Sequence, residues 1–199
     1  MTRQVDVAII GSGSAGLYAT SQVRKRTSNF VLINGGPKGT TCARVGCMPS
    51  KAAIQIAEDF HRRHHLATEG IRGGEGLTLD GRAAWARVRE LRDGFVGKVI
   101  ANSTDKMGDK FIEGYARLTG PNCLEVNGET IKADRIILAT GSHPVVPEAW
   151  QALGDRIVTT DDLFELDDLP ESMAVIGLGV IGLELGQALA RLGVKVTGI

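Results

Sequence analysis

The sequence predicts an α/β protein in which one Rossmann-like segment is followed by the start of a second. Three observations carry this prediction. A short apolar run at residues 5–10 leads into a glycine-rich turn, and the same arrangement returns after residues 173–176. Two cysteines, Cys42 and Cys47, follow the first turn closely. A repeated order of strand, glycine turn and helix is typical of parallel sheets that are covered by helices.

The first Rossmann-like segment opens with a strand, a turn and a helix. Residues 5–10 are apolar enough to predict a buried parallel strand, and a helical pattern runs from the glycine turn to about Lys25. Residues 30–33 predict the second strand. This order is the βαβ fingerprint of dinucleotide-binding proteins in the context that it requires.

Each glycine of the first turn has a predicted task. Gly11 permits the tight turn, Gly13 lets the backbone approach a pyrophosphate, and Gly16 permits close packing of the helix on the strand. We expect the pyrophosphate at the helix N-terminus, where free N–H groups and the helix dipole favour an anion. The residues expected to bind cofactor at this turn are Gly11, Ser12, Gly13, Ser14, Ala15 and Gly16.

The segment between the two glycine turns predicts helices first and strands afterwards. Helical periodicity covers residues 53–65 and 82–102. Residues 124–131 predict a hairpin with a type I′ Asn-Gly turn, and residues 136–139 predict a further buried strand.

The second Rossmann-like segment repeats the first one. The strand at 173–176 leads into the fingerprint at 177–182, and a helix over 183–192 and a strand over 194–199 are expected to follow. Because the chain ends at that strand, we expect it to be the N-terminal part of a longer protein. The predicted domains are 1–148, a connecting segment at 149–170, and an incomplete second domain at 171–199.

The spacing of Cys42 and Cys47 indicates redox chemistry. A disulfide between them would close a very small loop, so it would stabilise the fold by less than the ~3 kcal/mol expected for a loop of about 15 residues. A disulfide that contributes little stability is suited to reversible formation and cleavage. Zinc sites need two short Cys or His pairs, which this stretch lacks. Two buried structural cysteines are the alternative interpretation.

Residues 39–51 read Gly-Thr-Thr-Cys-Ala-Arg-Val-Gly-Cys-Met-Pro-Ser-Lys. This stretch resembles the active-site signature of the FAD-dependent pyridine nucleotide–disulfide oxidoreductases, and the resemblance extends over residues 5–199. The Pro-Ser-Lys ending is similar to the dihydrolipoamide dehydrogenase and mercuric reductase branches. The resemblance implies an FAD-binding domain that carries the cysteine pair, followed by the start of an NAD-binding domain.

The resemblance also implies roles for four side chains. Cys42 is the interchange thiol that attacks the substrate disulfide, and Cys47 is the thiol nearer the flavin. Lys51 approaches the flavin, and Glu184 is its ion-pair partner. A solvated lysine and an exposed glutamate on a helix are the alternative for the last two residues.

The same resemblance implies where two dinucleotides bind. FAD is expected to contact the first glycine turn together with Asn34, Gly35, Thr41, Cys42, Lys51, Ala116, Thr140, Gly141 and Ser142. NAD is expected to contact Gly177, Gly179, Gly182 and Glu184. Gly182 stands where NADP-dependent relatives often carry alanine, which favours NAD.

Three positions depart from the family pattern. Asn34 replaces the acidic residue that binds the adenosine ribose, and an amide lacks the charge that strengthens that hydrogen bond. Thr40 stands where glycine is usual, and Arg44 stands where asparagine is usual. The family's catalytic His–Glu pair lies near the C-terminus of the partner subunit, so His143 is expected to be structural.

Other chemically capable side chains are expected to play no catalytic part. His61, His64 and His65 cluster on a predicted helix, but no carboxylate or cysteine spacing supports a metal site there. A solvated helix face is the favoured interpretation. Cys123, at the start of a predicted strand, is expected to be a small core residue.

Composition excludes several classes of partner. The 199 residues carry a formal net charge of zero, which argues against nucleic acid or an anionic membrane surface. No apolar run is long enough to span a membrane, and no secretory signal pattern opens the chain. Three cysteines do not make a disulfide scaffold, so we expect a cytoplasmic protein.

The resemblance implies the N-terminal part of a dihydrolipoamide dehydrogenase-like flavoprotein. In that family, electrons pass from dihydrolipoamide to the cysteine pair, then to FAD and then to NAD. The expected partners are a lipoamide-type disulfide, carried on a 2-oxoacid dehydrogenase complex, and a second subunit in a homodimer. Two alternatives stay open, namely a mercuric or other disulfide reductase and a non-catalytic flavin-binding module.

Overall fold

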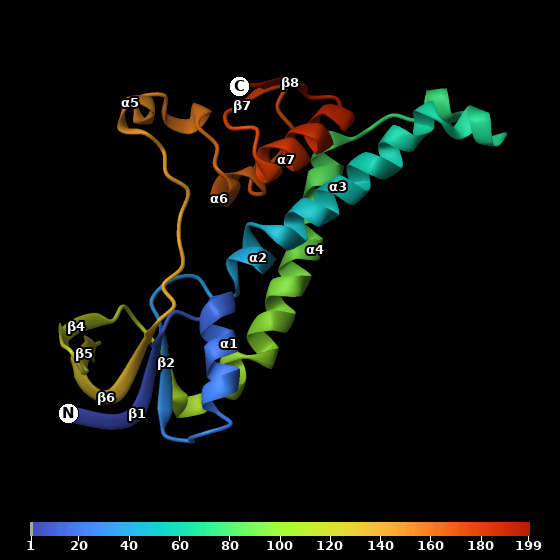
Figure 1. Ribbon diagram of the computed structural model, residues 1–199. Coiled ribbons are helices and arrows are strands. Elements are labelled where there is room, and N and C mark those ends of the chain that lie inside the picture. The colour runs from blue at the N-terminus through green and yellow to red at the C-terminus, as the bar shows by residue number, and fades with distance from the viewer. Residues whose placement is uncertain (1) are drawn as a thin grey trace. The chain divides into compact units, whose positions relative to one another are not determined.

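Two units make up residues 2–199, the part of the chain that the computed structural model describes (Figure 1). The first unit joins the N-terminal segment as far as Arg44 to Phe95–His143, and the second unit joins Val45–Gly94 to Pro144–Ile199. Each unit therefore combines two stretches that lie apart in the sequence. The domain boundaries expected after residues 148 and 170 stay a prediction.

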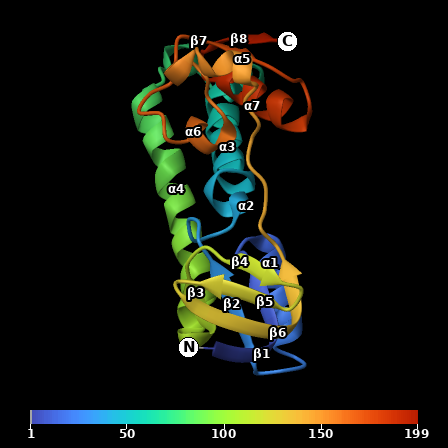
Figure 2. The ribbon, with the colours of Figure 1, turned by 90° about the vertical axis from the view of Figure 1, so that its left-hand side faces the viewer.

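The first unit is built on a six-stranded sheet whose order is β3-β2-β1-β6-β5-β4 (Figure 2). The strands β3, β2, β1 and β6 run parallel, whereas β5 and β4 run antiparallel to their neighbours. Because parallel strands end at the same edge, the segments that follow β1, β2 and β6 meet there. The bounds are β1 Thr2–Ile10, β2 Phe30–Asn34, β3 Phe111–Glu113, β4 Arg117–Gly120, β5 Cys123–Val126 and β6 Glu129–Leu138.

Both faces of β2 and of the second half of β1 are buried, which explains their continuous apolar sequences. On β2, Phe30 and Leu32 point to the side of α1 (Ser14–Val23), where Leu17 and Val23 pack against the same cluster. Val31 and Ile33 point to the opposite side, where residues of β5 and β6 cover them. The predicted strands at 5–10 and 30–33 and the helix between them are confirmed.

The predicted hairpin with its Asn-Gly turn is also confirmed. Asn127 and Gly128 join β5 to β6 with φ angles of 51° and 77°, the positive values that a type I′ turn requires. The expected strand at 136–139 is present as far as Leu138, where it ends the long strand β6, but its expected burial is wrong, since Leu138 is 62% exposed. The reason is that β5 pairs only with the first half of β6, so among the described strands only β1 flanks the second half.

The second unit contains the helix that carries the redox motif. Helix α3 (Cys47–His61) begins six residues before the predicted Ala53. Its early start is compatible with Pro49, because the N–H groups of a first helical turn have no intrahelical partner to lose. Helix α4 (Gly81–Asn102) matches its prediction and runs on into the first unit.

The predicted second Rossmann-like segment is present in the second unit. Strands β7 (Ser172–Val175) and β8 (Lys195–Gly198) pair in parallel, and α7 (Val180–Arg191) connects them. Shorter helices are α2 Thr41–Arg44, α5 Glu148–Gln151 and α6 Thr160–Leu163. Turns of 3-10 helix lie at Arg62–His64, Leu66–Glu69, Gly74–Gly76, Thr104–Lys106, Gly108–Lys110 and Gly154–Arg156. Within residues 2–199, no helix combines the length and the apolar character needed to cross a membrane.

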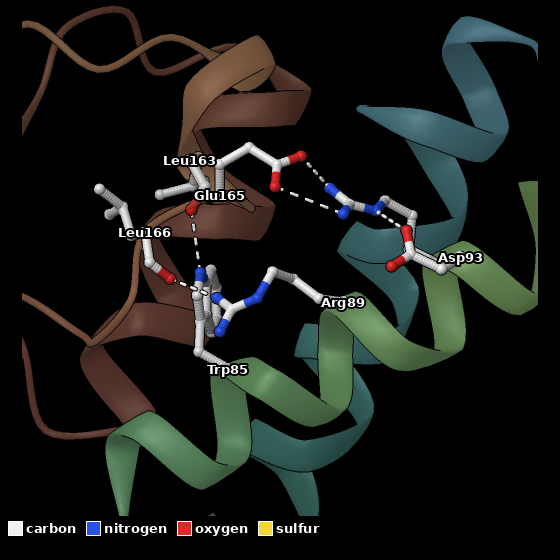
Figure 3. A network of polar contacts seen from close by, with 7 residues as sticks. Trp85, Arg89, Asp93, Leu163, Glu165 and Leu166 are labelled. Carbon is white, nitrogen blue, oxygen red and sulfur yellow. Dashed lines mark hydrogen bonds and ion pairs between the residues drawn. The ribbon is translucent and has the colours of Figure 1, made fainter. Parts of the chain in front are cut away.

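A tryptophan on α4 anchors the core of the second unit. Trp85 is 1% exposed, its ring stacks on that of Phe164 at a centroid distance of 6.1 Å, and its Nε1–H donates to the carbonyl oxygen of Leu163 at 2.9 Å. Figure 3 shows this bond beside Glu165 and Asp93, which both form ion pairs with Arg92. Burial opposes the charge of Arg92, but its hydrogen bonds to Glu165 and Asp93 raise the pKa of the guanidinium above its usual value.

Replacing Trp85 by alanine is expected to destabilise the chain by about 3–5 kcal/mol, because it leaves a large cavity and an unpaired carbonyl. Urea unfolding followed by circular dichroism would measure the loss. Trp150, which is 39% exposed, offers the matched control, and Trp150→Ala should cost less than about 1 kcal/mol. Equal losses of unfolding free energy in both variants would show that Trp85 contributes no more to the core than an exposed tryptophan does.

Candidate functional site

The first glycine turn has the geometry of a dinucleotide-binding loop. Gly11 has a φ of 105°, and a Cβ atom there would lie 2.1 Å from the carbonyl oxygen of Ala139. A Cβ on Gly16 would lie 1.7 Å from the carbonyl oxygen of Gly11. No side chain can be accommodated at either position without moving the backbone. Gly16 thus brings α1 against the turn itself, whereas the sequence predicted packing against the strand.

The N-terminus of α1 offers unpaired donors to an anion. Gly13 precedes the helix and provides no capping side chain, and the space beside its Cα is open. The hydroxyl of Ser12 is buried and has no hydrogen-bond partner among the described residues. An orphaned buried hydroxyl next to free N–H groups fits the phosphates of a dinucleotide.

Asn34 ties the end of β2 to the glycine turn. Its Oδ1 accepts a hydrogen bond from the backbone N–H of Ser12 at 3.1 Å, and its Nδ2 donates to the carbonyl oxygen of Gly36 at 2.6 Å. One N–H and one lone pair of the amide remain for a hydroxyl group. The residue that departs from the family's acidic pattern therefore keeps the capacity to bind a ribose.

The remaining predicted FAD contacts of the first unit lie at the same sheet edge. Gly35 packs so closely on the ring of Tyr115 that a Cβ would lie 2.4 Å from its Cγ, and Ala116 follows directly. The N–H of Ala139 donates to the carbonyl oxygen of Ile10 at 2.8 Å, which places Thr140–Ser142 beside the glycine turn. The structure brings these segments together, and their contacts with FAD stay a prediction.

The two motif cysteines form the expected disulfide. Cys42 lies on α2, Cys47 is the first residue of α3, and both are disulfide-bonded, whereas Cys123 is free. A thiolate released at Cys47 would lie at the N-terminus of α3, where the helix dipole favours negative charge. Cys123 is half-buried, so its interpretation as a core residue holds only in part.

Two departures from the family pattern have visible local effects. Thr40 accepts a hydrogen bond from the N–H of Ala43 at 3.0 Å, which caps the short helix α2. The stem of Arg44 packs on Gly39, and its Nε is buried without a partner among the described residues. The motif alone gave no signal for either contact.

Lys51 and Glu184 form the expected ion pair within the second unit. The Nζ of Lys51 donates to the Oε1 of Glu184 at 2.7 Å, and the two side chains are 59% and 40% exposed. The pairing agrees with the expectation, while the exposure of both side chains leaves a solvated lysine and an exposed helix glutamate as the alternative to a catalytic role. Their catalytic roles stay a prediction.

The second glycine turn repeats the geometry of the first. Gly177 has a φ of 92°, and a Cβ on Gly182 would lie 2.1 Å from the carbonyl oxygen of Gly177. Gly179 precedes α7 with open space beside it, so the helix N-terminus is accessible to an anion.

The histidine cluster follows the last turn of α3. The ring of His61 lies 5.4 Å from that of His64 and 5.8 Å from that of His65. Partial burial, together with the charge of Arg191, lowers the pKa of His61 below its usual value. In residues 2–199, no three His, Cys, Asp or Glu side chains are placed to hold a metal ion.

Two dinucleotide-type glycine turns and a disulfide within one short motif are the combination that dinucleotide-dependent disulfide oxidoreductases use. The chain belongs to the pyridine nucleotide-disulphide oxidoreductase family, whose sequence profile matches residues 5–199. The family consists of FAD-dependent flavoproteins. The resemblance that the redox motif carries is therefore confirmed.

Named relatives place the chain within this family. It is 33% identical over 194 residues to dihydrolipoyl dehydrogenase of Thermus scotoductus, covering 96% of the chain and 41% of the relative. It is 31% identical to a mercuric reductase of Staphylococcus aureus, covering 96% of the chain and 35% of the relative. The structure of the HOCl-induced flavoprotein disulfide reductase RclA from Escherichia coli superimposes with a TM-score of 0.79 at 26% identity, over 97% of this chain and 41% of that one. The chain thus spans less than half the length of these relatives.

Proposed function

We propose that the protein is an FAD-dependent dithiol/disulfide oxidoreductase that oxidises dihydrolipoamide with NAD. The observation that carries this proposal is the Cys42–Cys47 disulfide at the start of α3, one helical turn before Lys51, in a chain of this family. Similarity to dihydrolipoyl dehydrogenases from several organisms supports the choice of substrate.

The cysteine pair performs the exchange with the substrate. One thiolate of dihydrolipoamide attacks the Sγ of Cys42, the Cys42–Cys47 bond breaks, and Cys47 leaves as a thiolate. The second substrate thiol then attacks the mixed disulfide, which releases oxidised lipoamide and the Cys42 thiolate. The substrate loses two electrons and two protons, of which the cysteine pair gains the electrons as two thiolates and the surrounding water takes up the protons.

The remaining residues would hold the cofactors. The first glycine turn, Asn34, Ala116 and Thr140–Ser142 would bind FAD, which when bound accepts the electron pair and passes it to a nicotinamide. The ammonium group of Lys51, oriented by Glu184, would supply positive charge close to the flavin. Gly177, Gly179 and Gly182 would bind the pyrophosphate of NAD, and the glycine at 182 favours NAD over NADP.

Two other functions have a specific observation in their favour. The mercuric reductase of Staphylococcus aureus is about as similar to this chain as the dihydrolipoyl dehydrogenases are, which supports a reductase that runs electrons from nicotinamide to substrate. The first glycine turn, with its buried and unpaired Ser12 hydroxyl, supports a non-catalytic flavin-binding module as the further alternative. A homodimer, a cytoplasmic location and a 2-oxoacid dehydrogenase complex as partner belong to the first proposal.

Steady-state kinetics of the FAD-loaded full-length protein would test the choice. We expect NAD-dependent oxidation of dihydrolipoamide, with NADP a poorer acceptor. Faster NADPH-dependent reduction of Hg²⁺ than of lipoamide would contradict the proposal in favour of the reductase. A bound flavin with no turnover of either substrate would favour the binding module.

A further inference from the structure

Two ion pairs, and not one, join α3 to α7 in the second unit. Besides Lys51 and Glu184, Arg191 on α7 pairs with Glu58 on α3. Both pairs link residues that are 133 positions apart in the sequence. A constant offset means that the two helices run parallel, with the pairs two turns or roughly 10 Å apart along them.

The two pairs have opposite charge arrangements, because the base lies on α3 in the first pair and on α7 in the second. Helix α7 presents an acid first and a base last, the order that its own dipole favours, whereas α3 presents Lys51 before Glu58. The order on α3 is explained by its complementarity to α7. If α3 slipped by seven residues in one direction, Lys51 would meet Arg191. A slip in the other direction would bring Glu58 to Glu184, again with like charges.

The apolar contact between the helices combines small and large side chains. On α3, the buried residues of the shared core are Ala53 and Ala57, whereas α7 contributes Leu185, Ala188 and Leu189. The alanines let the helices approach closely, and the two ion pairs add to this apolar contact an interaction that depends on the register. The second pair is also the better shielded one, because Arg191 is only 26% exposed, against 59% for Lys51.

We propose that Glu58 and Arg191 are positioning residues that set the register of α3 on α7 and thereby keep Lys51 paired with Glu184. Because α3 begins at Cys47 and α7 begins after the second glycine turn, the same register fixes the start of the redox helix relative to that turn. The functional consequence rests on the proposed role of Lys51 near the flavin. The register itself is independent of that role.

The acylation rate of Lys51, followed by peptide mass spectrometry, would test this directly without flavin or substrate. In Glu58→Arg and in Arg191→Glu, Lys51 should react about two- to fivefold faster, the change expected when an exposed ion pair is lost. The double exchange Glu58→Arg with Arg191→Glu should restore the original rate, which general destabilisation would not do. Arg87→Glu, which breaks an exposed pair with Glu90 on α4, is the matched control and should leave Lys51 unchanged.

Unchanged reactivity of Lys51 in both single variants, or no recovery in the double exchange, would overturn the proposal. An equal rise at Lys195 would do so too, since it would show general loosening. Should the charge-reversed variants fail to fold, Glu58→Gln and Arg191→Gln replace them. An acylation rate of Lys51 equal to that of the parent chain would again overturn the proposal.

A kinetic experiment on the same variants distinguishes failure of this proposal from failure of the proposed function. In the FAD-loaded full-length protein, kcat should fall in each single variant and return in the double exchange, while KM for dihydrolipoamide stays constant. If the parent protein does not turn over dihydrolipoamide, the proposed function fails, and the acylation pattern still decides the register.

Discussion

Replacement of Cys42 by serine is expected to abolish disulfide exchange in the FAD-loaded full-length protein. The hydroxyl of serine cannot form the mixed disulfide with a substrate thiol, and Cys47 alone cannot store two electrons as a disulfide. Loss of a covalent nucleophile typically lowers turnover by roughly 10⁴–10⁶-fold. Dihydrolipoamide-dependent reduction of NAD, followed by the absorbance of NADH, would measure the loss.

Cys123 provides the control for this experiment, since it is the free cysteine of the described chain. Cys123→Ser should keep turnover within about twofold, because the hydroxyl replaces a half-buried thiol away from the motif. Substantial turnover in Cys42→Ser would show that the disulfide of α2 and α3 is structural, which is the alternative interpretation of the cysteine pair.

Replacement of Gly16 by valine is expected to remove FAD binding and to destabilise the first unit by about 3 kcal/mol or more. The Cβ of any residue at this position would lie 1.7 Å from the carbonyl oxygen of Gly11, so α1 must move away from the turn. The backbone N–H groups at the N-terminus of α1 would then no longer point toward one phosphate group. Thermal unfolding with and without FAD would measure both effects.

The matched control is Gly94→Val on α4. Gly94 is exposed and helical, and a Cβ there would meet no atom within 4 Å. Since valine has the higher helix propensity, the variant should be at least as stable as the parent chain, by up to about 0.5 kcal/mol. If Gly16→Val bound FAD as well as Gly94→Val does, the first turn would not be the flavin site.

The parts of the fold that local chemistry decides could be predicted from the sequence. The central strands β1 and β2 carry apolar runs, and the Asn127-Gly128 turn needs residues that tolerate positive φ. The glycine turns are likewise local, because Gly11 and Gly177 both adopt the left-handed conformation that the fingerprint requires. The disulfide could be predicted because its two cysteines lie in one short motif.

The parts that depend on a distant partner could not be predicted in this way. The periodicity over 53–65 predicts a helix, but not that α7 covers Ala53 and Ala57 or in which register. The amide of Asn34 bonds to Ser12, a contact that the sequence spacing does not reveal. The exposed end of β6 was missed because apolar residues predict burial whether or not a neighbouring strand is at hand.

A reductive titration would show whether one polypeptide couples the Cys42–Cys47 disulfide to a flavin. Anaerobic titration of the FAD-loaded full-length protein should consume roughly four electrons per flavin, two for the flavin and two for the disulfide. The Cys42→Ser variant should consume roughly two. Uptake of only two electrons by the parent protein, with Cys42 and Cys47 still resistant to alkylation, would show that the disulfide does not exchange electrons with the flavin.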